Sequence, residues 1–303
     1  MIHRNLPFEE YQKLTGINQS ALKHFERSPA HAREYIENGQ PETEPMKIGK
    51  LVHAQILEPD SGPLKTCVVK PDGMKFNTTV GKTWQAEQLA LGKTIIDDEQ
   101  DKLIFGALPR ISKHAYVSRI LAFGDSELSL TADLDGMPCK CRVDHLVSNT
   151  IADIKVVEDA RMFAFQRDIE KRGLHIQAAC YMDIANSPEN RPPGTVPIEC
   201  FVWIAIEKHA PFEMACWQLE SEDIERGRNE YRKLLNSLKN CQANSDWPGY
   251  EQVLKKIGLP EWRRRRDPDT RSTLEKLAGI PAPSEANYFI DADSDVDEPE
   301  FAL

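Results

Sequence analysis

Three charged residues stand in a segment that otherwise has the pattern of two apolar strands. The sequence of residues 142–157 is RVDHLVSNTIADIKVV, and Asp144, Asp153 and Lys155 interrupt its apolar positions. A charge inside a strand that packs on a core is costly unless it is paired or bound to a metal. The three residues therefore need a common explanation.

A hairpin register gives one. If Asn149 and Thr150 form a two-residue turn, Asp144 lies opposite Lys155. Residues that are directly opposite, or two apart on one strand, share a face of the sheet. This register predicts Asp144, Asp153 and Lys155 on one face, and on the other face an apolar set comprising Cys139, Cys141, Val143, Val147, Ala152, Ile154 and Val156. A slip of one residue would separate Asp144 from the other two charges.

Two converging carboxylates form a hard, oxygen-rich site that suits Mg²⁺ or Mn²⁺. Such a metal can bind a phosphate oxygen and lower the pKa of a bound water. An adjacent lysine can orient the attacking water or stabilise charge that develops at the phosphorus. The structural alternative is a simple cross-strand ion pair between Lys155 and Asp144.

Other residues are candidates for the same site. Glu127 begins the preceding predicted strand and can reach the same face, and His53 stands in a short predicted helix. A neutral imidazole is a suitable metal ligand, although a lone helical histidine is more often packed or exposed. Gln177 and Tyr181 are four residues apart and share one side of a later helix, which also fits ordinary amphipathic packing.

The elements that must position these residues are predicted from periodicity and turn signals. Helices are expected at 17–39 with an interruption near Pro29, at 46–58, at 97–113, at 163–185 with a break at Gly173, and at 221–240. Strands are expected at 127–134, 138–148, 150–157, 196–208 and 212–220, and residues 60–83 are rich in turns. This order predicts an α/β (mixed α+β) fold.

Composition narrows the class of protein. The chain has 303 residues, of which 40% are hydrophobic. Its apolar runs are far shorter than the roughly 20 residues that cross a bilayer, and its N-terminus lacks the apolar region of a signal peptide. We therefore expect a soluble, cytoplasmic protein with no membrane partner. The seven cysteines include no CxxC pair, so we expect reduced thiols and no iron–sulfur cluster.

The negative charge is unevenly distributed. The net charge is −10, and six of the carboxylates belong to residues 291–303, which contain no lysine or arginine. We expect one domain over residues 1–266, with a core at about 115–240, and a flexible acidic extension over 267–303. That extension fits either a docking peptide or a solubilising tail. The basic run Arg263–Arg266 fits either a phosphate contact or a solvated domain end.

The ordered set of residues resembles a nuclease family. Asp144 in CRVD, Asp153-Ile154-Lys155, and the flanking His53, Glu127 and Gln177–Tyr181 resemble the PD-(D/E)xK signature of the RecB-like branch. The N-terminal NQSALKHFERSPAHAREY and MKIGKLVHAQILEP are similar to the nuclease domain of exonuclease VIII (RecE) and its phage-encoded relatives. The resemblance covers about residues 5–265.

That resemblance implies a restriction-endonuclease-like core, a central mixed sheet flanked by helices with N-terminal helical additions. It also implies a Mg²⁺-dependent 5′→3′ exonuclease, with Mn²⁺ as a substitute, that acts on double-stranded DNA ends and leaves 3′ overhangs for recombination. Carried over by position, His53, Asp144, Asp153 and the Ile154 carbonyl would hold the metal, with Glu127 as an additional ligand. Lys155 would act on the water, and Gln177 and Tyr181 would support the site or contact the DNA backbone.

The same resemblance implies partners. It predicts a homo-oligomeric ring, a RecT-like single-strand annealing protein that docks through the C-terminal tail, and a bacterial or phage-infected host cell. Candidate contacts to the DNA backbone or its 5′-phosphate are Ser20, Lys23, His24 and Arg33, which fit an exposed helix face equally well. Alternatives are an endonuclease or single-strand nuclease on the same fold, a non-catalytic DNA-binding or scaffold module, and an adaptor acting through the acidic tail.

Overall fold

The computed structural model describes residues 1–59 and 62–260. Its contacts divide the chain into two units, Met1–Tyr250 and Glu251–Leu303. Every helix and strand of the described residues belongs to the first unit, and residues 251–260 of the second contain neither. The predicted extension 267–303 and the run Arg263–Arg266 lie outside the described residues, so the predicted domain boundary stays a prediction.

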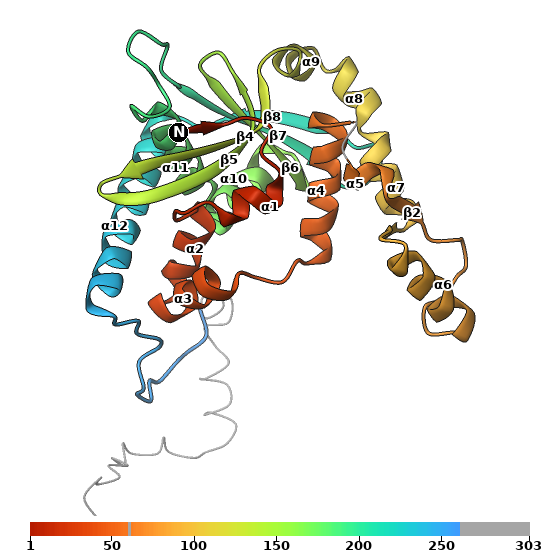
Figure 1. The fold of residues 1–303 in the computed structure, drawn as a ribbon, viewed down its shortest axis with the longest axis horizontal. Helices are drawn as coiled ribbons and strands as arrows, with labels where there is room; N and C mark the ends of the chain where they lie inside the picture. Colours follow the sequence, from red (N-terminus) through yellow and green to blue (C-terminus); the bar gives the residue numbers. More distant parts are fainter. Residues whose placement is uncertain (60–61, 261–303) are drawn as a thin grey trace, which may run out of the picture. The chain divides into compact units, whose positions relative to one another are not determined.

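A six-stranded mixed sheet forms the centre of the first unit (Figure 1). In spatial order its strands are β1 (Ile2–His3), β4 (Asp125–Leu134), β5 (Met137–Val147), β6 (Thr150–Val157), β7 (Cys200–Glu207) and β8 (Met214–Gln218). β6 and β7 pair in parallel, and the other neighbours are antiparallel. The predicted α/β class, with a central mixed sheet flanked by helices, is confirmed.

Both faces of the sheet are buried, which explains the nearly continuous apolar sequence of β7. Phe201, Trp203 and Ala205 belong to one core cluster, whereas Ile204 and Ile206 belong to a second, as the alternation of a strand requires. The first cluster is covered by α2 (Gln19–Arg27), α3 (Pro29–Asn38), α10 (Met162–Arg172), α11 (Leu174–Asn186) and α12 (Ser221–Asn244). The second is covered by α4 (Glu44–Leu57), α7 (Asp98–Gly106), α8 (Leu108–Lys113) and α9 (Ala115–Leu121).

The predicted helix interruptions are confirmed. Ser28 separates α2 from α3, and its hydroxyl accepts a hydrogen bond from the His31 amide at 3.3 Å while Pro29 occupies the first helical turn. Gly173 separates α10 from α11 and adopts the left-handed conformation that ends a helix. Both interruptions have the turn chemistry that the sequence shows.

The prediction for residues 60–83 is wrong in part. This stretch contains α5 (Gly62–Lys65), β2 (Cys67–Val69) and the start of α6 (Thr79–Ala90). β2 pairs in parallel with β3 (Thr94–Ile96). Each of these strands has three residues, too few for a periodic pattern, and their pairing depends on contacts distant in sequence. The short helix α9 was not predicted either.

A buried ammonium group ties the N-terminal helix α1 (Phe8–Lys13) to the sheet. Lys140 on β5 donates hydrogen bonds to the carbonyls of Gln12 at 2.8 Å and Leu14 at 2.6 Å. Its Nζ also lies 5.3 Å from the centre of the Tyr11 ring. The carbonyls at the end of a helix lack intrahelical partners and carry partial negative charge. The helical addition therefore supplies the partners that a buried lysine needs.

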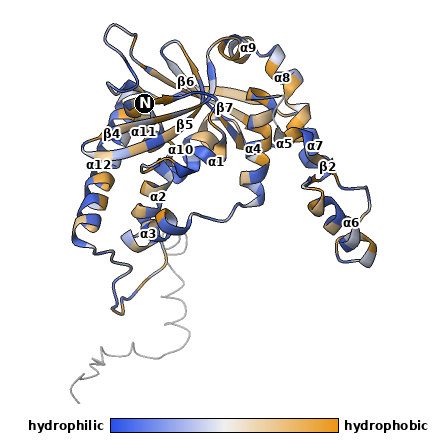
Figure 2. Ribbon diagram, in the orientation of Figure 1, coloured by the Kyte–Doolittle hydropathy of each residue, from blue (hydrophilic) through white to orange (hydrophobic). Residues whose placement is uncertain are grey.

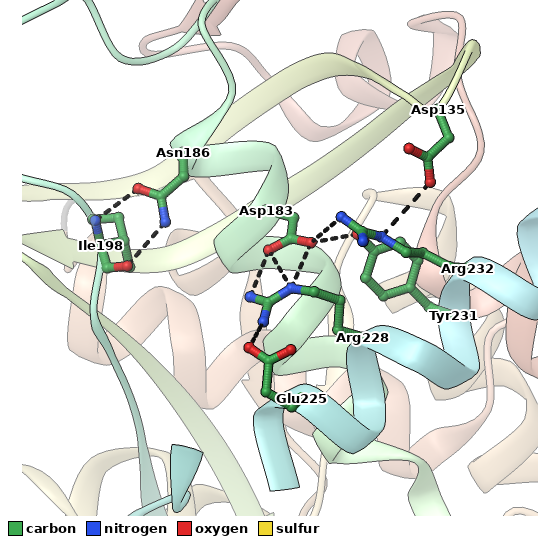
Figure 3. A network of polar contacts seen from close by, with 8 residues as sticks. All are labelled: Asp135, Asp183, Asn186, Ile198, Glu225, Arg228, Tyr231 and Arg232. Carbon is green, nitrogen blue, oxygen red and sulfur yellow. Dashed lines mark hydrogen bonds and ion pairs between the residues drawn. The ribbon is translucent and has the colours of Figure 1, made fainter. Parts of the chain in front are cut away.

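A polar network fixes α11 against α12 (Figure 3). Asp183 on α11 accepts hydrogen bonds from Arg228 Nη2 at 2.7 Å and from the Tyr231 hydroxyl at 2.5 Å. One turn later, Asn186 pairs with both backbone groups of Ile198, at 2.7 Å and 2.9 Å. Bidentate arginine–carboxylate pairs define geometry as well as energy. The network therefore fixes the rotation of α11 about its axis and its position along that axis.

Hydropathy follows this packing (Figure 2). The buried positions of α12 include Ile224, Tyr231, Leu235 and Leu238, which recur at helical spacing on one face. Figure 2 accordingly shows both hydrophobic and hydrophilic colours along this helix. Within residues 1–59 and 62–260, none of the helices has the length and apolarity to cross a membrane.

Two helical glycines test the packing of α11 on α12. A Cβ added at Gly227 would stand 2.3 Å from the His175 carbonyl oxygen, whereas one added at Gly49 would meet nothing within 4 Å. We expect Gly227→Ala to lower the free energy of unfolding by about 1–3 kcal/mol through overpacking. Gly49→Ala should raise it by roughly 0.5–1 kcal/mol through helix propensity. Urea denaturation measures both, and equal effects would contradict the close approach.

Candidate metal centre

The hairpin that carries the predicted charges has a different turn from the one expected. His145, Leu146 and Val147 pair with Ala152, Ile151 and Thr150, so the turn residues are Ser148 and Asn149. Ser148 has a φ of 52°, as a tight turn requires. The predicted turn at Asn149-Thr150 is wrong by one residue.

This shift alone does not separate the charges. Moving a two-residue turn by one position changes the partner of each residue by two positions, so Asp144, Asp153 and Lys155 stay on one predicted face. If this register is continued beyond the last pair, Asp144 lies opposite Asp153. In the predicted register, Asp144 lay opposite Lys155. The charges stay neighbours for this reason.

The ladder between β5 and β6 ends just before the charged residues. The last pair is His145–Ala152, and beyond it the Asp144 carboxylate accepts a hydrogen bond from the Ile154 amide at 2.7 Å. The side chain thus replaces a backbone partner that the separating strand no longer offers.

The predicted common apolar face is wrong. Cys139, Cys141 and Val143 pack in the first core cluster, whereas Val147, Ala152, Ile154 and Val156 pack in the second. Val143 and Val147 both stand on β5 but pack in different clusters, so the alternation of that strand is interrupted between them, beside Asp144. The seven cysteines all lie in the described residues and are free thiols.

Three side chains from three elements converge beside this opening. Ligand atoms of His53 on α4, Glu127 on β4 and Asp144 on β5 lie within 4.8 Å of one another. His53 Nδ1 is 3.4 Å from Asp144 Oδ2, and His53 Nε2 is 2.9 Å from the Ile154 carbonyl oxygen. One imidazole nitrogen, two carboxylates and a carbonyl form a donor set that fits Mg²⁺ or Mn²⁺.

Asp153 and its partners form an adjacent group. Asp153 is 2% exposed, and its Oδ2 lies 2.5 Å from the Lys155 ammonium. Its Oδ1 accepts a hydrogen bond from Gln177 Nε2 at 3.0 Å. Of the predicted metal ligands, Asp153 therefore lies outside the group of three. Lys155 pairs with Asp153 on its own strand rather than across the hairpin with Asp144.

The ionisation of the site shows that its carboxylates are crowded. Burial disfavours the His53 cation, but the neighbouring Asp144 carboxylate outweighs it and raises the pKa of His53 to about 9. Burial, with further repulsion from Asp144, raises the pKa values of both Glu127 and Asp153. Burial also opposes ionisation of Asp144, yet His53 and Lys155 hold the pKa of Asp144 below its usual value. A bound cation would relieve the repulsion at all three carboxylates.

Arg142, which was not among the predicted site residues, orients Glu127. Its Nε lies 2.5 Å from Glu127 Oε2, and its Nη1 donates to the Leu6 carbonyl at 2.7 Å and to the Ser129 hydroxyl at 3.0 Å. Glu127 has a φ of 51°, a conformation that side-chain-bearing residues rarely adopt. Such backbone is maintained only where the surroundings determine it, and the anchored guanidinium provides that constraint.

Gln177 and Tyr181 have different surroundings, although both stand on α11. Gln177 contacts Asp153 directly. Tyr181 packs against the first core cluster, with its ring edge on to Phe201 at 6.5 Å, and burial raises its pKa well above the usual value. Its hydroxyl is therefore neutral, and its ring supports α11 behind the site.

The four predicted DNA contacts lie on α2 and α3, outside the group formed by His53, Glu127 and Asp144. His24 stacks on Tyr35 at 4.6 Å, and Arg33 pairs with Glu37 at 2.7 Å. Ser20 and Lys23 are exposed. No hydrogen bond or ion pair joins any of the four to the candidate ligands in the described part of the chain, so their contact with DNA stays a prediction.

Comparison with known proteins agrees with this geometry. Residues 18–254 match a family described as a PDDEXK-like domain of unknown function (DUF3799). No curated protein sequence matches the chain. A crystal structure from Eubacterium rectale, of a protein described as a candidate exonuclease, has a similar fold with a TM-score of 0.58. The two share 14% sequence identity over 92% of this chain and 100% of the other.

The matched segment begins in front of α2 and ends beyond α12, so it contains every candidate ligand. The family description supports the PD-(D/E)xK nuclease superfamily, whose members generally require a divalent metal, and the structural match shows a shared fold. The chain belongs to the DUF3799 family of PDDEXK-like domains.

Proposed function

We propose that this chain is a Mg²⁺-dependent 5′→3′ exodeoxyribonuclease of the exonuclease VIII type, which degrades one strand of linear double-stranded DNA. The observation that carries the proposal is the convergence of His53, Glu127 and Asp144 beside the Asp153–Lys155 pair. The exonuclease description of the Eubacterium rectale protein supports the same activity class. We further propose a ring-shaped homo-oligomer and an annealing protein as a partner in recombination.

His53, Glu127, Asp144 and the Ile154 carbonyl would hold the metal, for which Mn²⁺ can substitute. When bound, that ion polarises a phosphate oxygen and lowers the pKa of a water. Both carboxylate oxygens of Asp153 have partners, Lys155 and Gln177. Asp153 would therefore join the ligand set only if its Oδ2 left the Lys155 ammonium and bound the metal. Gln177 keeps the Asp153 carboxylate in one orientation through its hydrogen bond.

Lys155 would act on the reacting atoms. Hydrolysis forms a bond between a water oxygen and phosphorus, breaks one phosphorus–oxygen bond, and passes a proton to the leaving oxygen. The Lys155 side chain is 13% exposed, so its ammonium stands at the boundary between the buried carboxylates and solvent. From there it can orient the water and stabilise the negative charge that develops on the phosphate.

An endonuclease or a single-strand nuclease would use the same residues. Linear duplex and covalently closed circular duplex separate these activities, because only an endonuclease cuts the circle. A non-catalytic binding module would retain the fold without turnover.

Lys155→Gln tests the activity and the role of the ammonium. We expect the wild-type protein with Mg²⁺ to shorten a linear duplex labelled at one 5′ end and to leave a closed circle intact. The variant should lose about 10²–10³-fold in rate, as when a preorganised stabilising group is removed. Lys113→Gln removes an exposed lysine of α8 and should retain the wild-type rate. Digestion of the linear duplex by Lys155→Gln at the wild-type rate would defeat the assignment.

Metal binding should release a proton. The pKa of His53 is raised to about 9, so at pH 7.5 the metal-free imidazole is protonated, while a metal ligand must be neutral. Mg²⁺ or Mn²⁺ binding should therefore release about one proton and weaken as pH falls below about 9. Calorimetry in buffers with different ionisation enthalpies measures this release. His175→Gln, which removes a histidine paired with Glu230, should leave it unchanged, and an unchanged release in His53→Gln would contradict the assignment.

Arg142 should act through Glu127. Removal of a residue that orients a metal ligand typically lowers the metal affinity about 10–100-fold. We expect about that loss of Mn²⁺ affinity in Arg142→Gln and in Glu127→Gln, and no further loss in the double variant. Calorimetric titration gives the three affinities. Additive losses would show that Arg142 supports the site through Leu6 and Ser129 instead.

A further inference from the structure

A cavity lies apart from the residues of the candidate metal centre. It has a volume of about 420 Å³ and is formed by the start of α4, the β2–β3 pair with its connecting loop, α6 and the start of α7. Three lysines line it, Lys47 on α4, Lys70 after β2 and Lys93 before β3. None of the residues already assigned to the metal centre lines this cavity.

The local charge is opposite to that of the whole protein. Three of the five charged residues that line the cavity are lysines, whereas the chain carries a net charge of −10. Within residues 1–59 and 62–260, neither Lys70 nor Lys93 takes part in an ion pair. A concentration of cations in an acidic protein is the arrangement by which such a protein can bind a polyanion.

The two acids that line the cavity have other partners. Glu44 lies 3.4 Å from the Lys47 ammonium, which also donates to the Ile95 carbonyl at 3.1 Å. Asp97 caps α7 and accepts a hydrogen bond from the Gln100 amide at 2.8 Å. In the described part of the chain, neither carboxylate forms an ion pair with Lys70 or Lys93.

Aromatic rings stand beside these cations. Phe76 lines the cavity and stacks with Trp84 of α6, with ring centres 6.3 Å apart and planes inclined by 14°. The Lys70 ammonium lies 5.6 Å from the centre of the Phe76 ring. Both rings are half-buried, so each keeps part of its surface in solvent. Proteins that bind single strands combine a cationic groove for the phosphates with aromatic faces for the bases.

Helix α4 connects this cavity to the metal centre. Lys47 stands in its first half and His53 in its second, six residues apart. At 1.5 Å per residue, the two Cα atoms are about 9 Å apart along the helix axis. The cavity and the metal centre therefore share helix α4, although at 3.6 residues per turn the two side chains leave the helix about 120° apart.

We propose that the cavity lined by Lys47, Lys70, Lys93 and Phe76 binds a single strand of DNA. The inference rests on the proposed nuclease function, since it identifies where that enzyme would hold one strand of its substrate. The lysines contact phosphates, and a base stacks on Phe76. Lys70 and Lys93 carry the binding because both are unpaired in the described residues.

Binding of a fluorescein-labelled 12-nucleotide oligo(dT) to the full chain, followed by anisotropy in EDTA, tests the proposal without cleavage. Lys70→Ala/Lys93→Ala should weaken binding at least tenfold at low salt. Each phosphate contact to a single strand contributes about 0.7 to the slope of log affinity against log salt, so this slope should fall by about 1.4. Phe76→Ala should weaken binding about tenfold and leave the slope unchanged, because stacking releases no counterions.

The matched control is Lys113→Ala/Lys233→Ala, which removes two exposed lysines from α8 and α12. It should keep the wild-type affinity within about twofold at the salt concentrations used. Equal weakening in the control and in Lys70→Ala/Lys93→Ala would overturn the proposal, because the lysines would then act only through net charge. Wild-type binding by Phe76→Ala would also overturn it, in favour of a site for phosphate alone.

The same variants separate this proposal from the proposed function. Circular dichroism and thermal melting establish that each variant is folded. If the wild-type protein binds oligo(dT) through Lys70, Lys93 and Phe76 but never cleaves DNA with Mg²⁺, the nuclease assignment fails and the binding site stands. If the wild-type protein cleaves linear duplex but the variants bind oligo(dT) as tightly as the wild type, the nuclease assignment stands and the proposed binding site fails.

Discussion

The hydrogen bond from the Ile154 amide to the Asp144 carboxylate is the contact on which the candidate centre depends. It lies where the β5–β6 ladder ends, and it satisfies a backbone donor that the sheet would otherwise leave unpaired. Because the amide is occupied in this way, the two strands can separate without a buried orphan group. The same peptide segment carries the Ile154 carbonyl, which faces His53 at 2.9 Å. One side chain thus opens the hairpin and holds the opening beside the ligands.

The packing of the two core clusters makes this opening rigid. Beyond the ladder, β6 stays paired in parallel with β7 along its whole length, so Asp153 and Lys155 keep their positions although β5 has turned away. α11 brings Gln177 to Asp153 from the first-cluster side, and Arg228 and Tyr231 fix the helix that carries it. α4 brings His53 from the second-cluster side. The site therefore receives side chains from both faces of the sheet, a ligand from α4 and a support for Asp153 from α11.

Much of the fold could be predicted from the sequence, because its signals are local. Ser28-Pro29 and Gly173 end helices by their own backbone chemistry, and the strands β4 to β6 follow from their apolar runs and the turns between them. The end of the β5–β6 ladder could not be predicted, since a strand pattern does not record where pairing stops. Glu127 could have been placed more firmly. The Asp135-Gly136 turn, extended along the β4–β5 register, sets Glu127 level with Asp144. Arg142 had a signal too, because a charged residue in a buried strand needs a carboxylate partner.

The electrostatics of the chain explain how an acidic protein can serve a polyanionic substrate. At the centre, burial and mutual repulsion raise the pKa values of Glu127 and Asp153, so the carboxylates favour a cation there. Such a cation would change the sign of the local field and make the site attractive to phosphate. The lysines of residues 65–93 act over a different range, because solvent screens exposed charges within about 10 Å at moderate salt. Under the proposed function, attraction of DNA would depend on where the positive charges lie, and the net charge of −10 would mainly oppose binding elsewhere on the surface.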